Sequence, residues 1–164
     1  MSTPDAAAGF SDQHRARFFA FLDRLAPKDR PVYGFSAQRP SLFQRLGGGT
    51  AYVVVLLFPD HVLFSTRRMA SDRESARAAR LLAEIVAIEV AAGPLRSTAL
   101  VKFVADKPMR LSNIPPAVAA PLARFRDDGL AAFERAELTP DAVRAFFVAC
   151  SRALPMPDGL FSDS

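Results

Sequence analysis

Apolar and polar positions follow two different periods along this chain, and the changes between them predict where helices and strands lie. Residues 10–26 read as an amphipathic helix with Phe18 and Leu22 on its apolar face. A second helix is predicted over residues 139–154, where Thr139 is a suitable N-cap and a proline follows at the first helical position. Its apolar residues recur at core spacing: Val143, Phe146, Phe147, Cys150 and Leu154.

Apolar runs between these helices predict two β-hairpins. Residues 31–38 form a short strand candidate, and the first hairpin joins residues 52–58 to residues 61–66. The second hairpin joins residues 97–104 to residues 109–114, and we expect four of its side chains to point inward: Leu100, Phe103, Met109 and Leu111. Residues 52–58 are apolar at every position, which predicts a strand covered on both faces, as in a small barrel or beneath helices.

Two interpretations stay open for residues 71–92. Ser71 with Glu74 three positions later matches a capping box and predicts that a helix begins there. A polar stripe then follows at helical spacing: Arg73, Arg77, Arg80 and Glu84. The β-branched cluster at residues 85–90 favours a strand instead. We expect a helix to about Leu82 and then a strand paired with residues 98–104, with one long helix as the alternative.

The segment after Asn113 predicts a helix that supplies the rest of the core. Pro121 suits a first helical turn, and Leu122, Phe125 and Phe133 form an apolar set that we expect to lie under the sheet. The predicted organisation is therefore a single domain over residues 1–164.

Composition is that of an ordinary globular protein: 164 residues, 50% hydrophobic and 23% charged. The N-terminus lacks the pattern of a signal peptide, and the longest apolar run is too short to span a bilayer. The single cysteine, Cys150, cannot form an internal disulfide and fits a reducing compartment. We therefore expect a cytoplasmic protein.

The net charge of +4 is unevenly distributed. The chain up to Arg126 has 18 basic and 10 acidic residues, whereas the chain from Asp127 onward has 3 basic and 7 acidic residues. Such polarity favours an acidic partner or the association of subunits head to tail, because net charge acts on association and not on fold.

The inventory of catalytic and metal-binding residues is small. Gly47, Gly48 and Gly49 precede a predicted strand and not a helix, and no lysine is near, so they predict a bend and not a phosphate loop. Two histidines and one cysteine do not supply a His/Cys metal site. We expect Asp60 and His61 to point apart in an extended segment. The sequence thus predicts a non-enzymatic protein without a cofactor or metal.

The most basic surface segment contains the arginines Arg67, Arg68, Arg73, Arg77 and Arg80. Guanidinium groups bind carboxylates and phosphates in bidentate geometry. No aromatic residues are interleaved for base stacking, so no nucleic acid is expected. We expect a protein partner or a homodimer, with acidic membrane lipid as a weaker alternative and a merely solvated face as the default interpretation.

The order of these elements resembles a bacterial pleckstrin homology-like (PH-like) domain. The likeness runs from Val32 to about Leu130, within a predicted core of residues 32–135. The stretch AEIVAIEV at residues 83–90 matches a strand of that family, and LSNIP at residues 111–115 matches the end of a hairpin that leads into the helix plugging the barrel. The resemblance implies an antiparallel split barrel, here with extra helices at both ends. It also implies a binding module without implying a lipid ligand, because only Arg39 and Arg45 lie in the loop where lipid-binding members carry a lysine-rich signature.

A long helix over residues 71–92 would instead make the chain similar to secretion chaperones. Those proteins have a two-layer α-β-β-β-α-β-β-α sandwich, dimerise and bind extended segments of client proteins. The secondary structure of residues 85–91 therefore distinguishes the two fold predictions.

Overall fold

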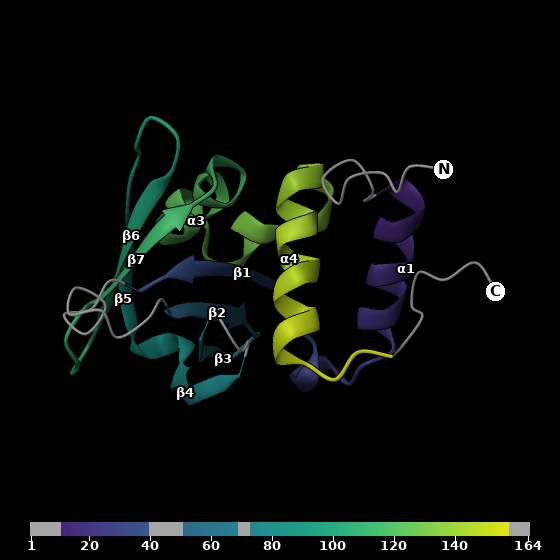
Figure 1. Ribbon diagram of the computed structural model, residues 1–164, viewed down its shortest axis with the longest axis horizontal. Coiled ribbons are helices and arrows are strands. Elements are labelled where there is room, and N and C mark those ends of the chain that lie inside the picture. Colours follow the sequence, from purple (N-terminus) through teal and green to yellow (C-terminus); the bar gives the residue numbers. More distant parts are fainter. Residues whose placement is uncertain (1–10, 40–50, 69–72, 158–164) are drawn as a thin grey trace.

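The computed structural model describes residues 11–39, 51–68 and 73–157. Within these ranges the protein has an α+β fold with a seven-stranded antiparallel sheet of order β4-β3-β2-β1-β7-β6-β5 (Figure 1). The strands are β1 (Tyr33–Gln38), β2 (Ala51–Leu57), β3 (His61–Arg68), β4 (Glu74–Leu81), β5 (Ile85–Ala91), β6 (Ser97–Phe103) and β7 (Met109–Ile114). The helices are α1 (Asp12–Asp23), α3 (Pro116–Asp128) and α4 (Pro140–Ala153).

The sheet is two antiparallel meanders joined at one point and open at its outer strands. Strands β1 to β4 pair in sequence, as do β5 to β7, and the two groups meet where Gln38 of β1 pairs with Ser112 of β7. Phe35, Val55 and Val101 are buried between the meanders. Helix α3 packs on β5 and β6, and its Leu122 reaches the same core.

Helix α4 covers the opposite face of β1 and β2, and α1 packs on the far side of α4 (Figure 1). Aromatic rings connect these layers. Phe146 of α4 lies 5.2 Å from the ring of Tyr33 in β1 and 5.1 Å from the ring of Phe18 in α1. The Tyr33 hydroxyl donates a hydrogen bond to the Ala142 carbonyl at 2.9 Å, and burial raises the pKa of this phenol. Both faces of β2 are therefore buried, as its continuous apolar run predicts.

Most predicted elements are confirmed. The two terminal helices and both hairpins are present, and residues 85–91 form β5, which pairs with β6 as predicted. Leu122 and Phe133 are buried, and Phe125 packs partly buried against the core.

The predicted helix from Ser71 to about Leu82 is wrong: residues 74–81 form β4. Ser71 itself lies outside the described residues. Glu74 does not cap a helix; its carboxylate accepts a hydrogen bond from Ser65 across the β3–β4 pair. Pairing with β3 thus overrides the helix propensity of an alanine- and arginine-rich segment. The long-helix alternative is wrong for the same reason, so the α-β-β-β-α-β-β-α order is not observed.

Two positions in the second half also differ from expectation. Leu100 is not directed inward with Phe103, because residues three apart in a strand face opposite sides; Ala99 and Val101 are the buried residues there. Pro121 is not in a first helical turn. Helix α3 begins at Pro116 and contains Pro121 in its interior.

Among the residues described, no helix is both long and apolar enough to cross a membrane.

Candidate binding groove

The arginines of the predicted basic face lie on different sides of a strand. In β4, Arg77 pairs across from Ser65 and Arg80 across from Val62, so their side chains face opposite sides of the sheet. The helical stripe of Arg73, Arg77 and Arg80 is therefore not present.

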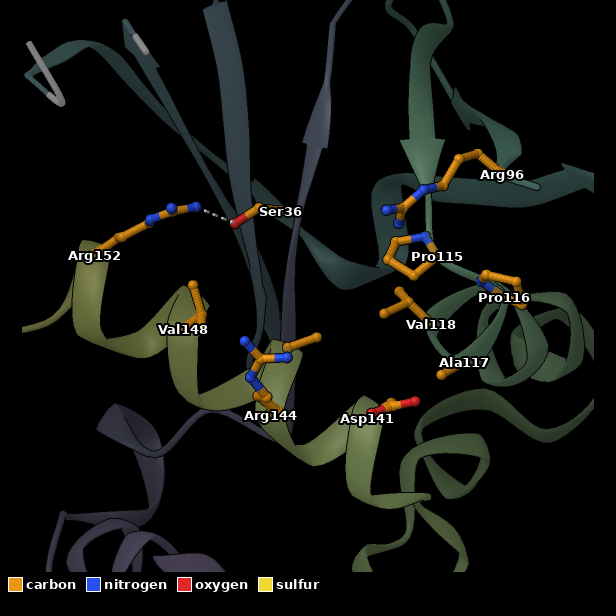
Figure 2. A pocket seen from close by; sticks show the side chains of 11 residues that line it. Ser36, Arg96, Pro115, Pro116, Ala117, Val118, Asp141, Arg144, Val148 and Arg152 are labelled. Atoms are coloured by element: carbon orange, nitrogen blue, oxygen red, sulfur yellow. Dashed lines mark hydrogen bonds between the residues drawn. The ribbon is translucent and has the colours of Figure 1, made fainter. Parts of the chain in front are cut away.

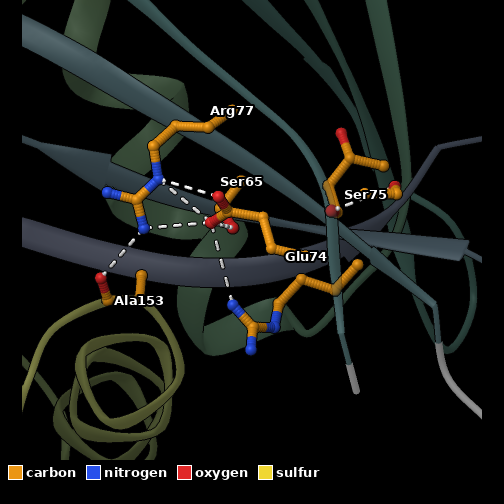
Figure 3. A network of polar contacts seen from close by, with 7 residues as sticks. Ser65, Glu74, Ser75, Arg77 and Ala153 are labelled. Atoms are coloured by element: carbon orange, nitrogen blue, oxygen red, sulfur yellow. Dashed lines mark hydrogen bonds and ion pairs between the residues drawn. The ribbon is translucent and has the colours of Figure 1, made fainter. Parts of the chain in front are cut away.

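Arg77 belongs to a polar network around Glu74 (Figure 3). Its Nε lies 3.0 Å from Glu74 Oε2, and a terminal nitrogen donates to the Ala153 carbonyl at the end of α4. Ser65, which is fully buried, donates to the same carboxylate at 2.6 Å, and Arg67 lies 3.9 Å from it. The hydrogen bonds from Arg77 and then Ser65 lower the pKa of Glu74. This network connects the edge strand β4 to the C-terminal end of α4.

The other predicted arginines are dispersed. Arg80 forms a 2.8 Å ion pair with Asp106 and lies over the ring of Phe103. Arg68 and Arg73 border an open hollow with Glu74 and Ser75, whereas Arg39 is exposed beyond the end of β1 and Arg45 lies outside the described residues.

The described histidines and the cysteine have structural surroundings. His14 completes the cap of α1 by accepting from the Ser11 amide. Asp60 and His61 do not point apart as predicted: Nδ1 of His61 lies 2.6 Å from Asp60 Oδ1, and its ring stacks on Phe58. This contact lowers the pKa of Asp60, with the hydrogen bond from His61 as the main cause. Cys150 is buried, and burial raises the pKa of its thiol.

A groove of about 580 Å³ lies between α4, the first turn of α3, β1 and the β5–β6 loop (Figure 2). Its apolar lining comes from the start of α3 and from α4: Pro115, Pro116, Ala117, Val118, Ala145 and Val148. Its charged lining consists of Arg96, Asp141, Arg144 and Arg152.

Helix α4 supplies one wall of the groove because two of its faces have different roles. Its apolar face packs on β1 and β2 through residues such as Val143 and Phe146. The adjacent face presents Asp141, Arg144 and Arg152 to the groove. Figure 2 shows Arg144 extending from α4, Arg96 reaching in from the β5–β6 loop, and Arg152 at the other end beside Ser36.

The three groove arginines are held differently. Arg152 donates to Ser36 Oγ at 3.3 Å, and its guanidinium lies 4.7 Å from the ring centroid of Tyr52, so its position is constrained. In the described parts of the chain, no ion pair joins Arg96 or Arg144 to an acidic residue. Asp141 lies in the first turn of α4, where a negative charge stabilises the helix N-terminus.

This arrangement suits a ligand that combines negative charge with an apolar part. Three guanidinium groups and one carboxylate line a groove whose remaining wall is proline, alanine and valine with the single hydroxyl of Ser36. A guanidinium binds a carboxylate or phosphate through paired hydrogen bonds, and the apolar wall adds burial of carbon atoms.

Sequence reasoning missed this groove because Arg144 and Arg152 belong to the acidic part of the sequence. Only the fold places them along the same groove as Arg96. One signal was present: Arg144, Val148 and Arg152 recur every four residues, adjacent to the core face of a predicted helix.

Within the described ranges, no three His, Cys, Asp or Glu side chains gather as a metal site. Comparison of the chain with known protein families and with curated proteins found no match.

Proposed function

We propose that this protein is a cytoplasmic, non-enzymatic binding module that holds an acidic segment of a protein partner in the groove between α4 and α3. The observation that carries the proposal is that Arg96, Arg144 and Arg152 line one apolar groove. The predicted arginine surface around β4 supports the proposal less well, because Arg77 and Arg80 already bind Glu74 and Asp106.

The fold that we propose for this module is a PH-like split barrel. This fold is supported by two antiparallel meanders that face each other and are joined between β1 and β7. It is also supported by the helix that follows them, which packs on β5 and β6. Helices α1 and α4 are additions to that core, and α4 forms one wall of the groove. No observation favours a secretion-type chaperone, since the helix on which that alternative depends is a strand.

A non-enzymatic role agrees with the surroundings of the nucleophilic and basic side chains. The Cys150 thiol is buried, and His14 and His61 are engaged in a helix cap and a turn. A buried free thiol also fits the reducing cytoplasm.

Site-specific photocrosslinking tests the proposal. A photoreactive residue placed at Ala145 in the groove should crosslink the partner in cells, and mass spectrometry should identify the attached peptide as acidic. The charge reversals Arg96→Glu and Arg144→Glu should abolish the crosslink. When the same crosslinking is carried out in a cell lysate, 1 M salt should weaken it, because the Debye length then falls to about 3 Å.

Arg126→Glu is the matched control, since Arg126 is an exposed arginine in α3 outside the groove. Crosslinks unaffected by the groove reversals, or equally reduced by the control, would contradict the proposal. A crosslink to a second copy of this chain would favour self-association, and a crosslink to lipid would favour a membrane ligand.

A further inference from the structure

Helix α4 presents three groove residues at equal intervals. Arg144, Val148 and Arg152 are separated by four residues each, and all three line the groove (Figure 2). Four residues of an α-helix rise about 6 Å. In an extended chain, side chains on one side recur about every 6.6 Å. An extended segment laid along α4 therefore places alternate side chains beside successive groove residues.

We infer that the groove recognises an extended segment with the pattern acidic-x-apolar-x-acidic. This inference rests on the proposed function, in which the groove is the binding site. The two acidic side chains pair with Arg144 and Arg152, and the apolar side chain packs on Val148. Both outer contacts are charge-assisted, and the central one adds apolar burial.

The contacts that each groove arginine makes within the protein are compatible with binding an acidic side chain. Arg152 is already oriented by Ser36 and Tyr52, so its side chain loses little freedom when a carboxylate binds. In the described part of the chain no ion pair occupies Arg144, so a ligand does not have to displace an internal partner. Arg96, on the opposite wall, adds a third positive charge.

The occupant is a segment of a different protein and not a second copy of this chain. Among the 164 residues, the only two acidic residues separated by four positions are Glu137 and Asp141, and the residue midway between them is Thr139. Thr139 caps α4 and Asp141 lies in its first turn, so this segment is part of the helix that forms the groove.

Two peptides of identical composition test the spacing. The peptide Gly-Glu-Ser-Leu-Ser-Glu-Gly has the inferred pattern in both chain directions, whereas Gly-Glu-Glu-Leu-Ser-Ser-Gly has adjacent acids. Fluorescence anisotropy with labelled peptides should show the first binding at least about tenfold more tightly than the second. Arg144→Gln and Arg152→Gln should each weaken binding of the first peptide about tenfold, and Arg126→Gln should leave it unchanged.

A charge swap separates loss of contact from loss of fold. Arg144→Glu should lose the first peptide and gain binding to Gly-Lys-Ser-Leu-Ser-Glu-Gly or its reverse, which an unfolded variant does not do. Equal binding of the two composition-matched peptides would overturn the spacing and leave the proposed function standing, because the crosslinking experiment does not depend on spacing. Absence of peptide binding would overturn the inference alone. Groove-dependent binding to phosphatidylserine vesicles without peptide binding would overturn it in favour of a lipid.

Discussion

Gly34 lies in β1 between Leu56 of β2 and Ala149 of α4. A methyl group on its Cα would be 2.5 Å from Leu56 Cδ2 and 3.2 Å from Ala149 Cβ. Because both neighbours belong to a packed core, Gly34→Ala should destabilise the fold by about 1–3 kcal/mol, measured as a lower urea midpoint with an unchanged slope.

Gly129, unlike Gly34, has open space beside its Cα. It ends α3 at φ 59°, and nothing lies within 4 Å of the position that a methyl group would occupy. Gly129→Ala therefore introduces backbone strain without a steric clash and should lower the free energy of unfolding by about 1–3 kcal/mol. Stability of Gly34→Ala equal to that of the wild type would show that Leu56 and Ala149 do not pack this closely on Gly34.

The network around Glu74 acts between elements, since it joins β3, β4 and the end of α4. Glu74→Gln should lower the free energy of unfolding by about 1 kcal/mol, because it removes a carboxylate that accepts from Arg77 and the buried Ser65. Glu89→Gln is the matched control: Glu89 pairs with Lys102 at 3.1 Å on a solvent-exposed surface, where such pairs contribute little.

The contribution of Glu74 should depend on pH with a definite sign. The hydrogen bond from Arg77 lowers its pKa below the ordinary value of 4.5 in the folded protein. The difference between wild type and Glu74→Gln is therefore fully present above pH 4.5 and is lost as the pH falls through the lower folded-state pKa. Urea denaturation of both proteins at a series of pH values measures this difference in the free energy of unfolding. A difference that grows toward acidic pH would contradict the role of this carboxylate.

Phe146 connects the sheet to both helical layers beside it, because it belongs to α4 and its ring packs on Tyr33 of β1 and on Phe18 of α1. Phe146→Ala should lower the free energy of unfolding by about 3–5 kcal/mol, measured by urea denaturation.

Unfolding of the wild type should be a single transition in which tyrosine fluorescence and far-ultraviolet circular dichroism coincide. The chain has two tyrosines and no tryptophan, so the fluorescence reports on β1 and β2. Separate transitions would show that the helical layers and the sheet are independent units.

The hydrophobic pattern is enough to predict the elements that local signals specify. Both hairpins, the two terminal helices and the strand at residues 85–91 follow from local apolar periodicity, turn residues and caps. The choice of core residues such as Leu122 and Phe133 also follows, because burial of large apolar side chains dominates folding free energy.

Long-range contacts in the folded protein set the secondary structure of residues 74–81 and the location of the groove. The first segment has helical propensity and becomes a strand because β3 offers a hydrogen-bonding edge and Ser65 a partner for Glu74. The groove brings Arg96, from the basic part of the sequence, together with Arg144 and Arg152, from the acidic part. The spacing of residues along the sequence carries no information on the distances between these arginines in the folded protein. Those distances are set by the packing of α4 on the outer face of β1 and β2.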